Sequence, residues 1–226
     1  MKNFRRVIAM ILTGMVLLGL TGCVGLPSQE DRFVTLVQGN LDEFYRGKAS
    51  DAYMKMVDTT ADEVTQDYLD GVAAEVDYFC TYFGVNPDIS EEMRTEMTDL
   101  CMELYANVRY TVGEAAKADD KTYTVKVVVE PLNILKQAVD THEEALAGFF
   151  EKHGEDDPEN MSDEDLAVYD SDWARAIIDM VKAQLTKLRY RDAETLDIHV
   201  VCDDDEIWRI STEDLQKLDS LIIYYP

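Results

Sequence analysis

The sequence predicts an α+β fold in which an antiparallel sheet of two hairpins packs against helices. Apolar residues recur at helical spacing through residues 29–108 and 133–188, whereas they alternate with polar residues through 108–130 and 196–211. The two alternating segments lie apart in the chain, and helical segments precede each of them. Such an order is typical of helices laid on an antiparallel sheet. Because no internal repeat or long linker interrupts residues 30–226, we expect one domain there.

Helix start and stop signals mark the first two helices. Ser28 can cap a helix whose apolar stripe ends at Gly47, and a short helical segment follows at 50–57. Thr60-Ala-Asp-Glu63 has the spacing of a capping box, in which the threonine oxygen and the glutamate each bond a backbone amide of the other. The stripe behind this box runs to Gly84, which predicts a long second helix.

A third helix and a first hairpin come next. Asp88-Ile-Ser-Glu91 begins a helix that carries apolar residues inward as far as Val108. The periodicity then changes to two, with strands at 108–116 and 122–130 around a turn at Asp119-Asp120. Pro131 ends the second strand because proline has no amide to donate.

The remaining segments repeat the same two patterns. A helical pattern spans 133–152, and an acidic loop follows at 154–160. Ser162 begins a long helix that is acidic at its start and basic near its end, as the helix dipole favours. A second hairpin is expected from Leu196 to Ser211, and a short helix at 213–218 precedes the apolar tail LIIYYP.

The first residues have the organisation of a signal peptide. Three basic residues precede an apolar run, Val7–Leu20, that is too short for a membrane-spanning helix, which needs about 20 apolar residues. The run ends at Leu20-Thr21-Gly22-Cys23, which resembles the lipobox of bacterial lipoproteins. That resemblance implies cleavage between Gly22 and Cys23 and acylation of the Cys23 sulfur. A transmembrane anchor and an ordinary secretory signal are the alternatives.

The lipobox sets the expected organisation of the whole chain. Residues 1–22 would be the signal peptide, 23–29 a tether and 30–226 the folded domain. The partner implied at this end is the membrane itself, reached through the lipid on Cys23, because two acyl chains anchor a protein durably. We therefore expect the protein at the extracytoplasmic face of the cell membrane.

Charge restricts the partners of the chain. Its formal net charge is −25, and removal of residues 1–22 would leave 18 Lys+Arg against 46 Asp+Glu, a net charge of −28. A negative field of this size repels phosphate, so we expect no nucleic-acid partner. The acidity favours solubility, and the alternative is attraction of cations or of a basic partner.

Longer segments resemble a known class of proteins. The element order is similar to that of NTF2-like, or cystatin-like, lipoprotein domains. The segments YLDGVAAEVDYFCTYFGV, YTVGEAAKADDKTYTVKVVVEPLNIL and IWRIST resemble a family of uncharacterised lipoproteins from Gram-positive anaerobes, a domain of unknown function. The resemblance implies an envelope location and an α+β fold, and it brings no known reaction.

The sequence carries no recognisable catalytic or metal-binding motif. Its histidines, His142, His153 and His199, are not spaced as zinc ligands, and no phosphate-binding or nucleophile motif occurs. We therefore predict no catalytic residue, no metal site and no cofactor. The three cysteines after Cys23 are odd in number and are interpreted as buried thiols.

One stretch of the second helix could contribute to a pocket. Glu75, Tyr78 and Tyr82 share a helix face, and Asp77 lies beside them. Against a concave sheet, this candidate pocket would combine tyrosine hydroxyls with a carboxylate, as ligand sites often do. The alternative is that these tyrosines bury their rings at the edge of the core and keep their hydroxyls in water.

An acidic turn is the other candidate. Asp203, Asp204, Asp205 and Glu206 follow one another between the strands of the second hairpin. Hard cations prefer oxygen ligands, so these residues are a candidate weak cation site, although an EF-hand pattern is missing. The alternative is an ordinary hairpin turn stabilised by local aspartate hydrogen bonds.

These observations favour a lipid-anchored binding or interaction module without catalytic activity, whose partner is an unknown small ligand or an envelope protein. Two alternatives remain open. One is an enzyme with an NTF2-like pocket that uses Glu75 or Asp77 as acid or base together with the tyrosines. The other is an accessory domain that supports another envelope protein and contacts it through its own tail, residues 221–225.

Overall fold

The computed structural model describes residues 16–17 and 27–226, and it divides the chain into two compact units. Within the described residues, the first unit holds the chain as far as Gly71 together with Val108–Pro131 and Arg191–Ile222. The second unit holds Val72–Asn107, Leu132–Tyr190 and Ile223–Pro226. The expected cleavage and lipidation site, Gly22 and Cys23, lies outside the described residues. The single domain expected over 30–226 stays a prediction.

The first unit is built on an antiparallel sheet. Its two hairpins are β2–β3 and β4–β5, and the pairing of β3 with β4, for example Tyr123 opposite Val200, joins them. The strand order is β1-β5-β4-β3-β2, where β1 is a pair of residues beside β5 at the sheet edge. The strands are β1 (Val16–Leu17), β2 (Arg109–Asp119), β3 (Thr122–Glu130), β4 (Glu194–Cys202) and β5 (Ile207–Ile210). The predicted α+β class with an antiparallel sheet is confirmed.

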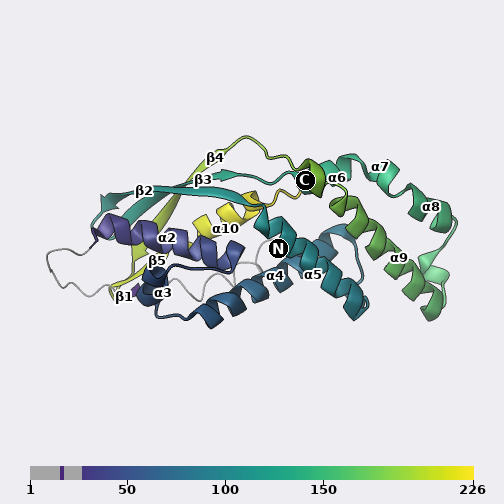
Figure 1. Ribbon diagram of the computed structural model, residues 1–226, viewed down its shortest axis with the longest axis horizontal. Helices are drawn as coiled ribbons and strands as arrows, with labels where there is room; N and C mark the ends of the chain where they lie inside the picture. The colour runs from purple at the N-terminus through teal and green to yellow at the C-terminus, as the bar shows by residue number, and fades with distance from the viewer. Residues whose placement is uncertain (1–15, 18–26) are drawn as a thin grey trace. The chain divides into compact units, whose positions relative to one another are not determined.

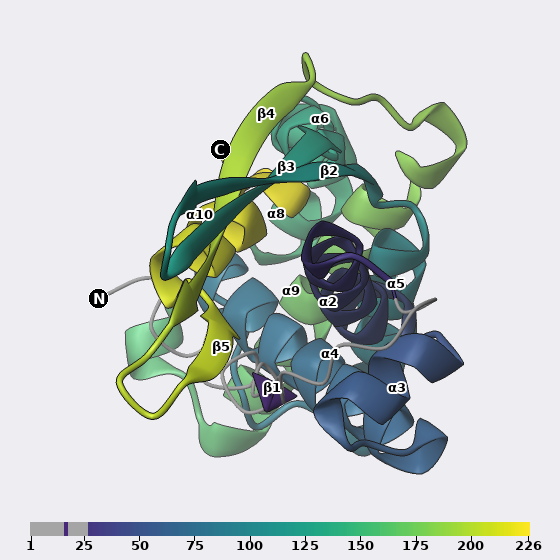
Figure 2. The same cartoon turned by 90° about the vertical axis from the view of Figure 1, so that its left-hand side faces the viewer.

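Helices α2 (Gln29–Arg46) and α10 (Thr212–Ile222) pack on one face of this sheet. Figure 1 and Figure 2 both show them on the same side of β2, β3 and β4. Successive side chains of a strand point to opposite faces, and this alternation explains the arrangement. Val125 and Val127 of β3 are fully buried on the face that the helices cover, whereas Val128, the next residue, is 37% exposed. The helices therefore cover a single apolar face.

The predicted caps form as the sequence indicated. Ser28 and Asp31 make a complete capping box at the start of α2, and Gly47 ends this helix with a left-handed φ of 60°. A short helix, α3 (Asp51–Val57), follows. The Glu63 carboxylate accepts the Thr60 amide at 2.8 Å at the start of α4 (Ala61–Phe83). Local side-chain bonds thus fix where these helices begin.

The second unit is helical. It contains α4 from Val72 onward, and α5 packs against α9, while α6, α7 and α8 follow one another along α9. Its core includes Met97, Leu104 and Ile178, which are fully buried. The remaining elements are α5 (Glu91–Ala106), α6 (Ile134–Asp140), α7 (His142–Ala145), α8 (Ala147–His153), η1 (Pro158–Asn160), α9 (Asp163–Lys182) and η2 (Leu185–Lys187).

Residues 133–152 do not form the continuous helix that their periodicity predicts. They form α6, α7 and α8, which are separated at Thr141 and Leu146. The Thr141 hydroxyl donates to the carbonyls of Gln137 and Ala138, and such back-bonding competes with the regular helical ladder. Periodicity reports the buried residues of α6 and α8, and it does not report a break in the ladder or the exposed turn of α7 between them.

Two other helix ends differ from expectation. Helix α9 ends at Lys182 because the chain turns back toward α6, where the Gln137 side chain accepts the Arg189 amide at 3.1 Å. Helix α10 extends to Ile222, four residues beyond the expected end.

Cys202 is less buried than predicted, while Cys80 and Cys101 are buried as expected.

Candidate functional site

Glu75 is a buried carboxylate in the second unit. Only 1% of the residue is exposed, although it lies in the middle of α4. It accepts a hydrogen bond of 3.2 Å from the Tyr105 hydroxyl of α5 and another from the Tyr225 hydroxyl near the end of the chain. Burial of a carboxyl group is costly unless hydrogen bonds compensate it. The two tyrosines supply that compensation.

Tyr78 and Tyr82 join the same cluster through Tyr225. Their ring centroids lie 4.8 and 4.9 Å from that of Tyr225, in edge-on geometry. The Tyr82 hydroxyl donates to the Pro226 carbonyl at 2.6 Å, and burial raises the pKa of this phenol. We call Glu75, Tyr78, Tyr82, Tyr105 and Tyr225 the tyrosine cluster. It joins α4, α5 and the last residues of the chain.

Asp77 does not belong to the tyrosine cluster. Its side chain is 67% exposed and pairs with Arg94 of α5 at 3.2 Å. Glu75 and Asp77 lie on different faces of α4, because side chains two residues apart in a helix point in different directions. The structure therefore brings together three of the four predicted residues. The expected pocket between them and the sheet stays a prediction.

Tyr105 and Tyr225 were missed by sequence reasoning. Tyr105 lies 30 residues from Glu75 and Tyr225 lies 150 residues away, so no local pattern connects them. The tail offered one signal, since its apolar residues predicted a contact surface. Ile223 is 2% exposed and Tyr225 bonds Glu75, so these two residues of the tail make contacts within this chain. The use of residues 221–225 as a contact surface for an envelope protein stays a prediction.

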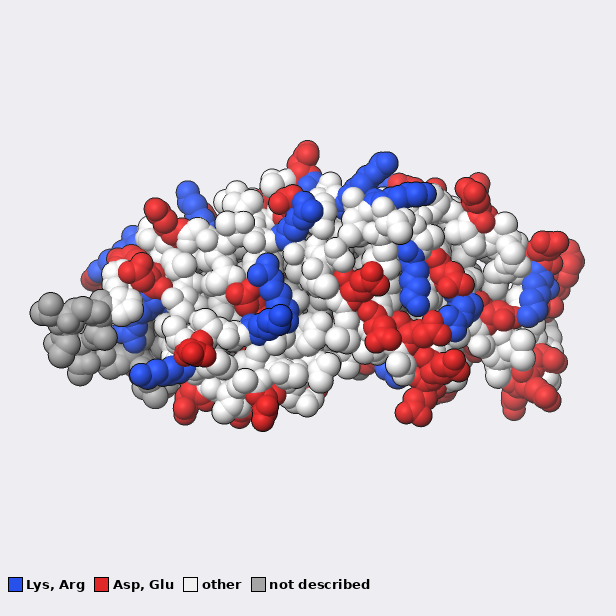
Figure 3. Space-filling view, viewed as in Figure 1, with Lys and Arg blue, Asp and Glu red and all other residues white. Residues whose placement is uncertain are grey.

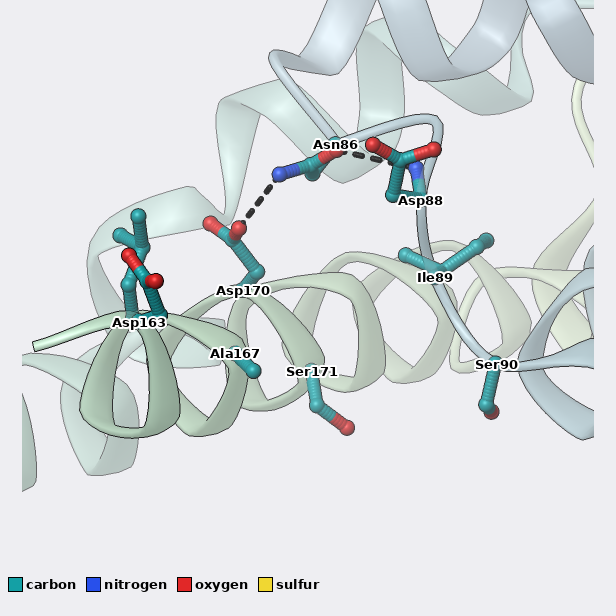
Figure 4. Close-up of a pocket in the computed structure, with 9 residues that line it drawn as sticks. Asn86, Asp88, Ile89, Ser90, Asp163, Ala167, Asp170 and Ser171 are labelled. Atoms are coloured by element: carbon teal, nitrogen blue, oxygen red, sulfur yellow. Dashed lines mark hydrogen bonds between the residues drawn. The ribbon is translucent and has the colours of Figure 1, made fainter.

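A pocket of about 530 Å³ lies elsewhere in the second unit. One wall is the loop between α4 and α5, as far as the N-cap residue Ser90 of α5, and the other is the first part of α9. Figure 4 shows the Asn86 side chain pointing toward Asp170 of α9, with Ile89 beside the same helix. The loop contributes Asn86, Asp88, Ile89 and Ser90, and α9 contributes Asp163, Leu166, Ala167, Asp170 and Ser171.

Three aspartates and a few apolar side chains define this acidic pocket. Asp170 accepts the Asn86 amide at 2.6 Å, and the Asn86 carbonyl accepts the Asp88 backbone amide at 2.9 Å, which ties the loop to α9. Among the described residues, the carboxylates of Asp88 and Asp163 have no hydrogen-bond or ion-pair partner. The described residues that line the pocket include no Lys or Arg.

The acidic turn at residues 203–206 is stabilised by its own aspartate. The Asp203 carboxylate accepts the amides of Ile207 and Asp205 and the Arg209 guanidinium, at 2.9, 3.0 and 3.0 Å. The bond from Ile207 in particular lowers the pKa of Asp203. Asp204 pairs with Lys121 at 3.1 Å. These contacts favour the turn interpretation, and the weak cation site stays a prediction.

Two histidines pair with aspartates. His153 lies between Asp156 and Asp172 at 2.6 and 2.8 Å, and its hydrogen bonds to Asp172 and Asp156 raise its pKa. The Asp214 carboxylate accepts the ring and the backbone amide of His199 at 2.7 and 3.0 Å. Within residues 16–17 and 27–226, no group of three or more His, Cys, Asp or Glu is arranged to hold a metal ion.

Comparisons with known proteins show a likeness of fold. No family model and no curated protein matches the sequence. The chain resembles the crystal structure, at 2.62 Å resolution, of a Bacillus subtilis subsp. subtilis str. 168 protein (ycdA) provisionally described as a lipoprotein. The TM-score is 0.56 at 15% sequence identity, over 87% of this chain and 57% of that protein.

That match covers little more than half of the Bacillus protein. At 15% identity it shows a shared fold, and residue roles do not transfer with it. In the part of the chain that the structure describes, no helix is both long and apolar enough to cross a membrane.

Proposed function

We propose that this protein is a lipid-anchored binding module without catalytic activity at the extracytoplasmic face of a Gram-positive cell membrane. The acidic pocket carries the binding part of the proposal. Ligand sites are typically concave, between about 300 and 1,000 Å³, with apolar walls and a few polar groups. The pocket of about 530 Å³ falls in this size range, and Ile89, Leu166 and Ala167 line it beside six polar residues.

The location rests on the sequence and on the fold. Leu20-Thr21-Gly22-Cys23 resembles a lipobox behind a basic and apolar leader. The likeness to a protein provisionally described as a lipoprotein supports the same location. Anchored through Cys23, the domain would be held a few residues from the membrane surface.

Metabolic labelling tests the anchor. Cells that express the chain are grown with radioactive palmitate, and the membrane fraction is isolated. We expect label on the wild-type protein and none on the Cys23→Ala variant, with Cys202→Ala as the matched control that keeps its label. Label that persists on Cys23→Ala would contradict lipidation at this residue.

Thermal shift tests the binding activity. The full chain in non-ionic detergent is heated with a panel of small molecules, peptides and divalent ions. A ligand that binds only the folded state raises the unfolding temperature. We expect at least one such ligand. A panel without any shift, combined with turnover of a defined substrate, would contradict the proposal.

The competing function is an enzyme that uses the tyrosine cluster. The observation that favours this function is that the buried Glu75 carboxylate accepts hydrogen bonds from two tyrosine hydroxyls. Against it, Asp77 is exposed and paired with Arg94, so a second carboxylate does not join Glu75 there. Both tyrosine contacts satisfy a buried group, which is a structural role. If the wild type turns over a substrate, and Glu75→Gln loses this activity while its free energy of unfolding is unchanged, catalysis by the tyrosine cluster would instead be supported.

A further inference from the structure

The outer edge of β5 pairs with a segment that the proposed processing would remove. Val16 lies opposite Trp208 and Leu17 opposite Ile207, in antiparallel register. Both residues of β1 precede Gly22, so cleavage after Gly22 would take β1 away and leave β5 at the edge of the sheet. We infer that this edge of the processed chain binds an extended apolar segment of a partner protein as an added antiparallel strand. Strand β5 belongs to the first unit and the acidic pocket to the second, and the vacancy at β5 rests on the proposed cleavage.

The backbone groups of β5 point alternately to its two sides. The Ile207 carbonyl accepts the amide of Asp203, at the end of β4, at 2.9 Å, so the backbone of Ile207 faces β4. Because the direction of the N–H and C=O groups alternates along an antiparallel strand, those of Trp208 and Ile210 point to the outer edge. An added strand can therefore exchange backbone hydrogen bonds with both residues.

The side chains of β5 give this edge one apolar face. Trp208 and Ile210 are buried, whereas Arg209 between them is exposed. The ring centroid of Trp208 lies 4.8 Å from that of Phe33 and 5.6 Å from that of Tyr123. In a strand added opposite Trp208, the residue that pairs with it would place its side chain on this same face. The partner segment should therefore alternate apolar residues with polar ones.

The surroundings of the edge favour a single strand over the sheet of a second copy. Helix α3 also lies next to β1, and Figure 1 and Figure 2 both show β1 beside β5 and α3. One extended segment fits the place that β1 takes. The sheet of a second copy, added at the same edge, would meet α3.

The opposite edge of the sheet is protected against pairing, which sets β5 apart. Strand β2 carries two register shifts, and the charged residues Lys117 and Asp119 lie at the second. Bulges and charged side chains on an edge strand oppose the addition of another strand. Strand β5, in contrast, pairs with β4 in continuous register. Its edge is therefore the one suited to accept a partner.

Charge limits the partner segment further. Asp and Glu are spread over the face drawn in Figure 3, and the formal net charge of the chain is −25. A field of one sign repels ligands of the same sign. The polar positions of the partner segment should therefore be neutral or basic.

Amide hydrogen exchange of the processed chain tests the added strand. The isotope-labelled chain is extracted from the membrane in non-ionic detergent, and its mass verifies that residues 1–22 are absent. The probe is a short synthetic peptide in which valine alternates with threonine between glycine-serine ends. At saturation, we expect the peptide to slow exchange of the Trp208 and Ile210 amides by about tenfold or more. Exchange of the Arg209 amide, which faces β4, should change by less than about twofold.

Two N-methylated peptides separate backbone pairing from apolar contact. Methylation of every valine amide removes the donors that would face β5, whereas methylation of every threonine amide alters the other side of the strand. Both peptides keep the same side chains, and fluorescence anisotropy measures their affinities. We expect the first to bind about tenfold more weakly than the parent peptide and the second to stay within about threefold of it. Equal affinities of the two would overturn strand pairing, because apolar contact alone would then explain the binding.

A proline variant tests the edge from the side of the protein. Ile210→Pro removes an outward-facing amide of β5, and proline is tolerated in edge strands where the missing N–H faces solvent. Ile210→Val keeps the amide and has a side chain of similar size, so it is the matched control. The proline should weaken peptide binding by about threefold to tenfold, and the valine by less than about twofold. Unfolding curves verify that both variants are folded, and equal binding by the two would contradict pairing at this edge.

The remaining outcomes separate the edge of β5 from the proposed function. If residues 1–22 are absent and the peptide leaves exchange of the Trp208 amide unchanged up to its solubility limit, the added strand is overturned while the lipid anchor stands. A mass that includes residues 1–22 overturns both the cleavage and the vacant edge. A small molecule that raises the unfolding temperature would support the acidic pocket as a binding site in either case.

Discussion

The hydroxyl of Tyr225 donates a hydrogen bond to the Glu75 carboxylate and so joins the end of the chain to the middle of α4. Tyr105 bonds the same carboxylate from α5. The second unit therefore contains a buried acid whose partners come from two distant segments. Each donor removed leaves a buried acceptor partly unsatisfied.

Tyr225→Phe should lower the free energy of unfolding. Hydrogen bonds to charged or buried acceptors contribute about 1–3 kcal/mol, and the phenylalanine ring keeps the contacts with Tyr78 and Tyr82. Urea unfolding of the full chain measures the change. Tyr123→Phe is the control, because its hydroxyl bonds the half-buried Gln29 side chain at 3.1 Å, and it should lose about 0.5–1 kcal/mol. Equal stability of Tyr225→Phe and wild type would refute the role of this bond.

A glycine pair tests the packing of α2 on α3. A Cβ added at Gly39 would lie 2.1 Å from the buried Tyr53 ring, so Gly39→Ala forces that ring to move and should cost about 1–3 kcal/mol. Gly148 of α8 has open space around its Cβ position, so Gly148→Ala should stabilise by about 0.5–1 kcal/mol through helix propensity. Thermal unfolding would show opposite shifts. Shifts of the same sign would contradict this packing.

Glu96 should make the protein sensitive to acid. The bidentate Arg175 guanidinium lowers the pKa of Glu96 to about 2 from its ordinary 4.5. A depressed pKa gives stability that is present above about pH 4.5 and is lost as the pH falls toward 2. Urea midpoints between pH 5 and 3 should therefore fall less in Glu96→Gln than in wild type. Glu103→Gln, an equal charge change on the same helix, should follow wild type. An identical acid response of all three proteins would argue against the pair.

His153 should give a pH dependence of the opposite sign. Bonds to Asp172 and Asp156 raise its pKa above the ordinary 6.5, so its stabilising effect is complete below that pH and is lost as the pH rises through the raised pKa. The urea midpoint of wild type should fall over this window, and His153→Gln should flatten the dependence. His142→Gln, at an exposed histidine, serves as the control. An NMR titration of the His153 ring with an ordinary pKa would contradict the arrangement.

Sequence patterns predicted the local elements well because their causes are local. The Ser28 and Thr60 capping boxes each close within three residues, and Gly47 ends α2 through its own φ. Alternation predicted both hairpins, since one face of β3 is buried and the other is not. Residues 133–152 were predicted less well, because Thr141 interrupts the ladder without changing the periodicity.

The candidate sites depended on contacts across the sequence. Helical spacing placed Glu75, Tyr78 and Tyr82 near one another, and it did not show that Tyr225 would bond the carboxylate. The acidic pocket combines residues 86–90 with residues 163–171, and the bond between Asn86 and Asp170 joins positions 84 residues apart. Taken alone, residues 86–90 and residues 163–171 each have the pattern of an ordinary helix start, so neither segment predicts the pocket.

The sequence by itself determined the helix boundaries set by caps, the two hairpins, the acidic charge and the lipobox-like leader. Those properties depend on neighbouring residues or on composition. Only the tertiary structure decided which carboxylates are buried, paired or open to a ligand. The physical reason is that burial and pairing depend on which distant side chains meet, as Glu75 meets Tyr225 while Asp88 and Asp163 face a pocket.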